Sequence, residues 1–213
     1  MPGRPNHVQR GLRAAAVLPL FDSVFGVALT LLAFSVPDDV MGGMDALNLA
    51  LAIGVYLLSG LAVVLFWFKL RRQIEIARQL LLSQACLGLL SLLVIVLLPK
   101  MVQLVVLHGN GSGDLRNWTP AQIVNTVFLG ALLLQDGICL GFSWSLLGHT
   151  PVRNGDRAQI RLALRVQLAG FLALLSLGVL ELGLTSFNNE FVLIVPVILL
   201  LEEWLVARCL ARL

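Results

Sequence analysis

Six long apolar segments constrain the fold of this chain more than any single motif does. Each is close to the ~20 residues that a helix needs to cross a hydrocarbon core of ~30 Å. They cover 17–36, 44–68, 80–98, 121–147, 162–184 and 191–206. The last is the least apolar, because Glu202 and Glu203 fall near its end. With 58% hydrophobic and 13% charged residues, the composition is also far from that of a soluble domain of 213 residues. The sequence predicts an integral membrane protein with six transmembrane segments.

The segments are expected to be helices. Lipid offers no partner to backbone polar groups, so a spanning chain forms helices or a closed barrel. The apolar runs are continuous and do not alternate with a period of two, which favours helices. The connections are short except between Pro99 and Pro120, where HGNGSGDLRNWTP predicts an exposed loop. We therefore expect one all-α transmembrane domain over residues 1–213.

Basic residues are distributed unevenly between the two sides of the predicted bundle. Thirteen of the 15 Lys and Arg fall on the side that carries both termini, and the other two are Lys100 and Arg116. In this count Lys69 is one of four basic residues that follow the second segment. The positive-inside rule then places both termini in the cytoplasm.

Several function classes lack their sequence signatures. The three cysteines are isolated, and the three histidines lie in different terminal or loop regions, so no metal-ligand or disulfide spacing is present. The sequence contains no glycine-rich phosphate loop after a strand, and no basic stripe with interleaved aromatic residues. No nucleophile and no acid and base pair converge. We expect no enzyme activity, no metal, no cofactor and no nucleic-acid partner.

Polar groups inside apolar segments are candidates for function, because their burial in a membrane is costly. They are Asp22, Gln135, Asp136 and Glu181. One interpretation is a neutral carboxyl group hydrogen-bonded to a neighbouring helix, and another is a titrating group, for which Asp136 is a candidate. The indole of Trp67, at the cytoplasmic end of the second segment, could donate a hydrogen bond to Asp22, or could be an interface anchor.

A narrow apolar stripe runs along the first segment beside Asp22. At 100° per residue, Val27, Leu31 and Phe34 lie at i, i+4 and i+7 and share one face of a helix. Asp22 lies about 140° from Val27, and Thr30 lies about 60° from it. The carboxylate therefore does not line the stripe, whose apolar side chains are equally compatible with packing or lipid contact.

The first three segments resemble a known family. DSVFGVALTLL, residues 22–32, is similar to the first helix of the transmembrane protein 175 family, six-helix potassium channels of bacteria and lysosomes. YLLSGLAVVLFW, residues 56–67, is similar to that family's Tyr, Ser and Trp spacing in the second helix, and LLP, residues 97–99, resembles the end of its third helix. The last three segments agree with the family only in topology.

This resemblance implies a homotetramer in which four copies of the first helix line a central pore. Val27, Leu31 and Phe34 would form its hydrophobic constriction, Thr30 would flank the pore, and potassium would be the permeant ion. The chain has no TVGYG carbonyl filter, so rings of apolar side chains would gate by excluding water.

The chain departs from the family around the aspartate. The family pattern is Arg, three residues, Phe, Ser and Asp, and the corresponding residues here are Ala16, Leu20, Phe21 and Asp22. The histidine expected shortly after Trp67 is also absent. In the family these polar groups bond to one another and hold the first helix. The remaining network would consist of Asp22, Ser23 and Trp67, with Arg13 as a substitute for the missing guanidinium.

Three functional hypotheses follow. The first is a potassium-permeable cation channel with a hydrophobic gate in the first helix. The second is a proton-coupled transporter or proton-leak pathway that uses Asp22 and Asp136 as titrating groups. The third is a non-conducting membrane scaffold derived from the channel family. A lipid bilayer is the expected environment, and a bacterial plasma membrane is the expected location.

Overall fold

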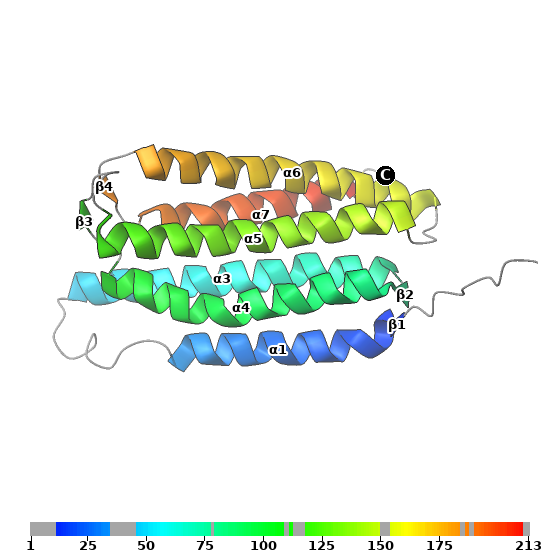
Figure 1. Cartoon of the computed structure of the whole chain (residues 1–213), viewed down its shortest axis with the longest axis horizontal. Coiled ribbons are helices and arrows are strands. Elements are labelled where there is room, and N and C mark those ends of the chain that lie inside the picture. The colour runs from blue at the N-terminus through cyan, green and yellow to red at the C-terminus, as the bar shows by residue number, and fades with distance from the viewer. Residues whose placement is uncertain are drawn as a thin grey trace, which may run out of the picture.

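The computed structural model describes the parts of the chain from which the bundle is built. They are residues 12–34, 46–77, 79–108, 111–112, 118–149, 154–183, 186–187 and 190–210. These residues form the six long helices shown in Figure 1. The helices are α1 (Ala14–Phe34), α3 (Ala46–Ala77), α4 (Leu82–His108), α5 (Pro120–His149), α6 (Asn154–Gly183) and α7 (Glu190–Leu210). Each helix overlaps one predicted apolar segment, so the expected architecture of six helices is confirmed for these residues.

Membrane-spanning character is clearest in three of the described helices. By length and composition, Leu82–Val105, Pro120–Gly148 and Arg157–Leu180 are suited to crossing a bilayer, and Ala16–Leu32 is a shorter apolar helix. Together with the apolar composition, these spans indicate a multi-pass membrane protein. Several helices extend beyond the predicted segments, so they are longer than the apolar stretches from which they were predicted.

α4 corrects one sequence expectation. The sequence predicted a helix ending at Pro99 and a loop from there to Pro120, but α4 continues through Pro99 to His108. Proline at an internal position removes one backbone hydrogen bond, a loss that membrane helices tolerate when neighbouring helices pack against the site. Pro99 is buried, and the adjacent Leu98 is only 2% exposed, so the packing keeps the helix intact.

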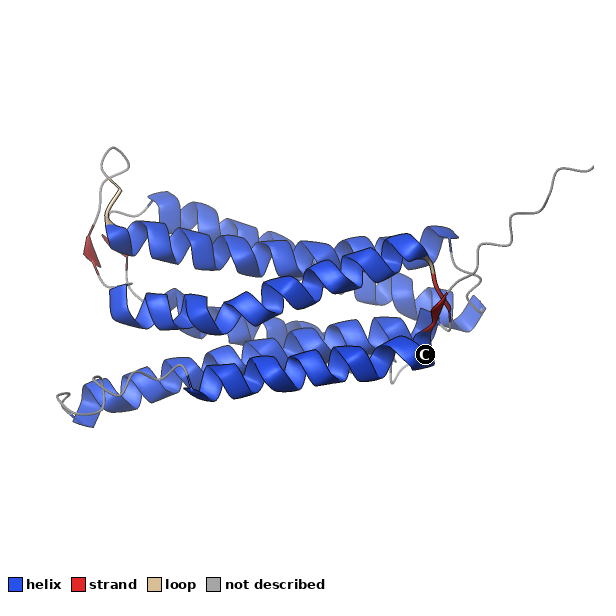
Figure 2. Cartoon of the chain, turned by 60° about the horizontal axis from the view of Figure 1, so that its bottom comes forward, coloured by secondary structure: helices blue, strands red, loops and turns tan. Residues whose placement is uncertain are grey.

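The helices lie nearly parallel and antiparallel in a layered bundle. α1 packs against α3 and α4, whereas α6 packs against α5 and α7. α3 contacts α7 and α5 in the middle of the bundle. Figure 1 shows α1 and α6 at opposite edges, and Figure 2 shows the helices running along the length of the bundle with the short strands at its two ends. The outer faces of α1 and α6 can therefore contact lipid or another copy of the chain.

Two very short strand pairs hold connections together at the ends of the bundle. β1 (Leu12–Arg13) pairs antiparallel with β2 (Gln79–Leu80). β3 (Gly111–Ser112) pairs antiparallel with β4 (Ser186–Phe187) at the opposite end. The first described residues and the end of α7 lie at the same end in Figure 1, as an even number of crossings requires. We call this the β1 end of the bundle.

One glycine allows α1 to approach α4 closely. A Cβ atom at Gly88 would lie 2.5 Å from the ring of Phe21, a separation that real Cβ contacts do not show. Phe21 is 3% exposed, so its ring is seated directly on the α4 backbone. This contact fixes the rotation of α1 about its axis, and with it the direction of the opposite face.

Candidate functional site

α1 has one buried face and one exposed face. The buried residues are Ala14, Phe21, Phe25, Ala28 and Leu32. On the other side, Val27 is 55% exposed, Leu31 is 45% exposed and Phe34 is 82% exposed. All three residues of the predicted stripe are therefore exposed in the described part of the chain.

Two hydroxyl groups on α1 bond to the backbone of their own helix. Thr30 donates to the Gly26 carbonyl at 2.9 Å, and Ser23 donates to the Pro19 carbonyl at 2.8 Å. Ser23 was expected in the network around Asp22, and the structure places its hydrogen bond within α1 instead. Thr30 is exposed on the same side as the apolar stripe.

Asp22 is bound by two side chains of α3. Trp67 Nε1 donates a hydrogen bond of 2.8 Å to Asp22 Oδ1, and an Arg71 guanidinium nitrogen lies 3.8 Å from Asp22 Oδ2. The Trp67 ring also meets Phe25 edge to face, with ring centroids 6.5 Å apart. This combination of polar and aromatic contacts ties the first half of α1 to α3.

Arg71 supplies the guanidinium that the sequence pattern lacked. It stacks over the Trp67 ring at 5.1 Å and donates from Nε to Glu75 at 2.9 Å. Arg13, which the sequence suggested for this role, lies in β1, where its backbone pairs with Gln79. Because Arg71 follows Trp67 by four residues, both side chains lie on the same face of α3. That spacing is the signal that sequence reasoning missed.

A second polar site is fully buried between α3, α5 and α7. Lys69 Nζ donates to Asp136 Oδ1 at 2.8 Å and is also hydrogen-bonded and ion-paired to Glu202 Oε2. The side chains of Lys69, Asp136 and Glu202 are 1%, 0% and 5% exposed. These three residues, which we call the ionic triad, join three helices. Asp136 thus has a lysine partner.

The carboxylate of Glu202 contacts a glycine on α6. A Cβ atom at Gly170 would overlap Glu202 Oε1. Only the absence of a side chain allows the carboxylate to lie against the α6 backbone. α6, which contributes no residue to the ionic triad, therefore accommodates it by having glycine at this position.

A layer of neutral polar groups lies beside the ionic triad. Gln73 donates to the Cys139 carbonyl at 3.1 Å and to Ser143 Oγ at 2.7 Å. Ser143 in turn donates to Gln167 Oε1 at 3.0 Å. Gln135 on α5 donates to Ser91 Oγ on α4 at 2.6 Å. These bonds extend the polar interior from α3 through α5 to α6 and α4.

The polar layer borders a cavity of about 340 Å³ at the β1 end. Its polar lining comprises Arg72, Gln73, Glu75, Ser143, Gln159 and Gln167. Arg72 forms two hydrogen bonds to Glu203, at 2.9 and 3.2 Å. Among the residues the structure describes, no group of three or more His, Cys, Asp or Glu is arranged to hold a metal ion.

Asp22, Trp67 and Asp136 were predicted as candidates from the sequence, whereas Lys69 was counted among the charges that follow the second segment. Its carboxylate partners lie 67 and 133 positions away in the chain. A local signal was available, because Lys69 and Gln73 share one face of α3. The side chain of Glu181, another polar candidate, lies outside the described residues.

Comparison with known proteins bears on the first half of the chain. Residues 17–99 match the endosomal/lysosomal potassium channel family TMEM175. The resemblance seen in the sequence is thereby confirmed over α1, α3 and most of α4. The TMEM175-like region contains the α1 stripe, Asp22 and Trp67, and also Lys69, whereas Asp136 and Glu202 lie beyond it. No curated protein and no solved structure matches the chain.

Proposed function

We propose that this protein is a potassium-permeable cation channel whose pore is lined by α1. The observation that carries the proposal is the uncovered stripe of Val27, Leu31 and Phe34 on an edge helix of the TMEM175-like region. One protomer presents this stripe on one side only, so a closed pore requires further copies around an axis. Four copies, with both termini in the cytoplasm, give the assembly that we propose.

The first half and the end of α1 differ in how strongly they are held by the rest of the protomer. Phe21, seated on Gly88, and Asp22, bound by Trp67 and Arg71, hold the first half of α1 against its own protomer. Phe34, which lies at the last residue of α1, is 82% exposed. Rings of such apolar side chains exclude water when narrow, so opening requires α1 to tilt or rotate at this end. Asp22 would then act as an anchor and not as an ion ligand.

Ion flux in liposomes tests the channel directly. We expect potassium flux to exceed sodium flux, and Val27→Ala, Leu31→Ala or Phe34→Ala to change the flux by about tenfold or more, because each widens the constriction. Leu172→Ala, an equally large change on the exposed face of α6, is the matched control and should leave the flux unchanged. Absence of flux in the parent protein and all these variants would contradict the proposal.

The assembly has a separate test. Because Cys86 is a free and exposed cysteine, the native cysteines are first replaced by serine. Oxidation of a Val27→Cys variant in this background should give disulfide-linked protomers if four α1 helices surround an axis. Val179→Cys, on the edge helix α6, is the control and should not cross-link at the same concentration. A monomer in mild detergent together with equal cross-linking at both positions would rule out an α1 pore.

A second candidate function is proton-coupled transport or proton leak. The observation that favours it is the buried ionic triad, in which two carboxylates share one lysine. This function would show flux that depends on a pH gradient and that Asp136→Asn or Asp22→Asn abolishes, whereas Val27→Ala would leave it intact. A non-conducting scaffold would be silent in both flux assays.

A further inference from the structure

α6 carries a regular row of arginines on its outer face. Arg157, Arg161 and Arg165 follow one another at intervals of four residues, and all three are exposed. Residues at this spacing lie one above another on a helix, about 6 Å apart. We call them the α6 arginine row. It runs inward from the β1 end of the bundle.

The α6 arginine row lacks the ion pairs and ring contacts that most of the other described basic side chains form. Lys69, Arg71 and Arg72 form ion pairs, and Arg208 stacks over Trp204 at 4.8 Å. Within the described part of the chain, the structure gives the three arginines of the row no ion pair, hydrogen bond or ring contact. Like charges at i and i+4 repel one another, so the row is left with an unbalanced positive charge.

α6 itself has no acidic residue placed to neutralise the charge of Arg161 or Arg165. Its acidic residues are Asp156 and Glu181, and neither lies three or four positions from Arg161 or Arg165. The described carboxylates of the other helices are already engaged in ion pairs within the chain. They are Asp22, Glu75, Asp136, Glu202 and Glu203. A second copy of this chain would therefore bring no free described carboxylate to the row.

The same face of α6 becomes apolar further along the helix. Leu168, Leu172, Leu175 and Val179 continue the row at alternating intervals of three and four residues, and are 42–64% exposed. Only 22% of the α6 span is buried, against 50% for the α4 span and 44% for the α5 span. α6 lies at the edge of the bundle opposite α1 (Figure 1), so this apolar strip faces away from the proposed pore.

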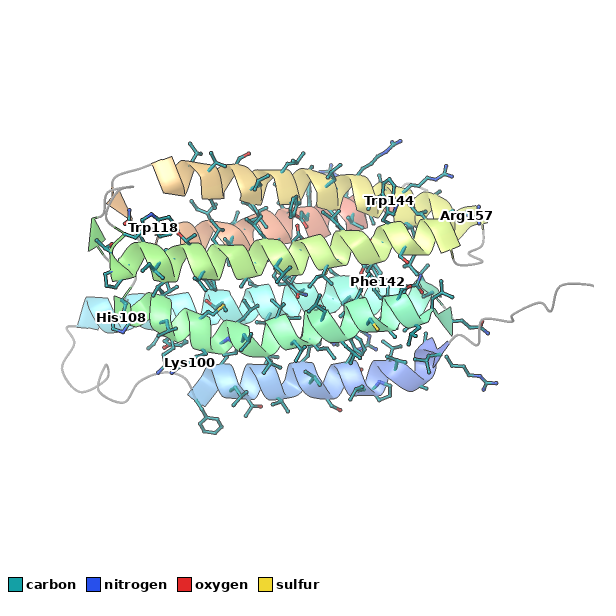
Figure 3. All side chains as sticks on the ribbon, in the orientation of Figure 1. Lys100, His108, Trp118, Phe142, Trp144 and Arg157 are labelled. Atoms are coloured by element: carbon teal, nitrogen blue, oxygen red, sulfur yellow. The ribbon has the colours of Figure 1, made fainter. Side chains whose placement is uncertain are left out.

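The surroundings of the row match a membrane interface. Trp144, on the neighbouring helix α5, is 71% exposed and lies near the same end of the bundle as Arg157 (Figure 3). Exposed tryptophans are typical of the level of the lipid headgroups. Three arginines over about 12 Å of helix cover the depth from the aqueous surface to the start of the hydrocarbon core.

We propose that the α6 arginine row binds the phosphate of an anionic phospholipid, whose acyl chains lie along Leu168, Leu172, Leu175 and Val179. The planar guanidinium group donates paired hydrogen bonds to phosphate oxygens, and several such groups neutralise a headgroup that carries net negative charge. A lipid is favoured over a soluble anion because only a lipid has acyl chains that can contact the adjoining apolar strip. The site depends on the placement of the protein in a membrane and not on ion conduction.

Lipid retention by the purified full chain tests this site. The chain in dodecyl maltoside is titrated with palmitoyl-oleoyl phosphatidylglycerol or palmitoyl-oleoyl phosphatidylcholine, and bound lipid is counted by native mass spectrometry. We expect retention of phosphatidylglycerol to exceed that of phosphatidylcholine by about tenfold. The triple variant Arg157→Gln, Arg161→Gln, Arg165→Gln should lose this preference.

The matched control removes the same charge from the same side of the predicted topology. It is the triple variant Arg4→Gln, Arg10→Gln, Arg13→Gln, which should keep the preference. Equal loss in both triple variants would show only a general attraction to positive charge and would overturn the site. So would equal retention of both lipids by the parent protein, or a change of oligomeric state in the α6 variant, which would indicate a contact between copies.

A charge-preserving variant keeps the proposal testable if the glutamine variant does not fold. Replacing the three residues of the row by lysine retains the charge but removes the paired donors of guanidinium. We expect phosphatidylglycerol retention to fall severalfold in this variant while its helical circular dichroism is unchanged. Unchanged retention would contradict recognition by the guanidinium groups.

Discussion

Lys69 on α3 is bonded to Asp136 on α5 across 2.8 Å, and neither side chain is more than 1% exposed. The same ammonium group also binds Glu202 on α7. A buried ion pair contributes little net stability compared with apolar residues of similar size, but a buried charge that has lost its partner is expensive. The ionic triad therefore specifies how three helices meet, because any other arrangement leaves a charge without its counterion.

Removal of the lysine should be far more damaging than removal of an exposed arginine. Lys69→Met leaves Asp136 and Glu202 buried without a cation, and we expect a loss of roughly 3–5 kcal/mol in the free energy of unfolding. Arg71→Met, two residues further along, is the comparison and should cost clearly less than Lys69→Met, because the ion pairs of Arg71 with Asp22 and Glu75 are exposed and screened by solvent. Denaturant titration followed by circular dichroism in detergent measures both. Equal effects of the two substitutions would contradict the burial of Lys69.

The glycine beneath Glu202 gives a second prediction. Gly170→Ala places a Cβ atom where Glu202 Oε1 now lies, so the carboxylate must move and the ion pair with Lys69 weakens. We expect a destabilisation of roughly 1–3 kcal/mol, as for other overpacked interiors. Gly130→Ala is the matched control, since a Cβ atom there meets nothing within 4 Å. Thermal unfolding of both variants is the measurement, and equal midpoints would show that Glu202 does not occupy this seat.

The double variant Gly170→Ala, Glu202→Ala refines this test. If Gly170→Ala destabilises the protein by a clash with the Glu202 side chain, Glu202→Ala removes that clash. The two changes in the free energy of unfolding will then not add. Independent effects would instead sum to the double-variant value.

The positions of the six helices could be predicted from the sequence because apolarity is a local property. The window 121–147 lies within α5, and the window 191–206 lies within α7. The extension of α4 past Pro99 could not be predicted, because it depends on packing around the proline and not on local propensity. α6 begins eight residues before its predicted window for a related reason, since its first turns include Arg157 and Arg161, which lower the apolarity of the window.

The candidate site was predicted only where its residues are neighbours on one helix. The stripe of Val27, Leu31 and Phe34 follows from helical periodicity alone, although its role in a pore remains a proposal. Lys69 was assigned to the charges outside the membrane because a basic residue at the end of an apolar segment usually lies in solvent. Its burial is decided by Asp136 and Glu202, which only the tertiary fold brings to it.

The anchoring of α1 provides another prediction. Trp67→Phe keeps the aromatic contact with Phe25 but removes the 2.8 Å hydrogen bond to Asp22. We expect a destabilisation of about 1 kcal/mol, which is typical of one side-chain hydrogen bond. In the Asp22→Asn background the same substitution should cost less, because the acceptor has lost its charge. A double-mutant cycle by denaturant titration measures this coupling, and a coupling energy of zero would show that the hydrogen bond does not contribute to stability.

The contact between Gly88 and Phe21 links packing to the proposed pore. A Cβ atom at Gly88 would overlap the Phe21 ring at 2.5 Å, so Gly88→Ala must push or rotate α1 away from α4. Since Val27 and Leu31 lie on the exposed part of α1, away from the Phe21 contact, such a displacement moves them relative to the axis of the proposed tetramer. We therefore expect Gly88→Ala to change potassium flux in liposomes by about tenfold, as a shift of a hydrophobic constriction would. Phe21→Leu in the same protein shortens the side chain and should restore the flux toward the parent value. A Gly88→Ala variant with parental flux would show that the position of α1 against α4 does not control the pathway.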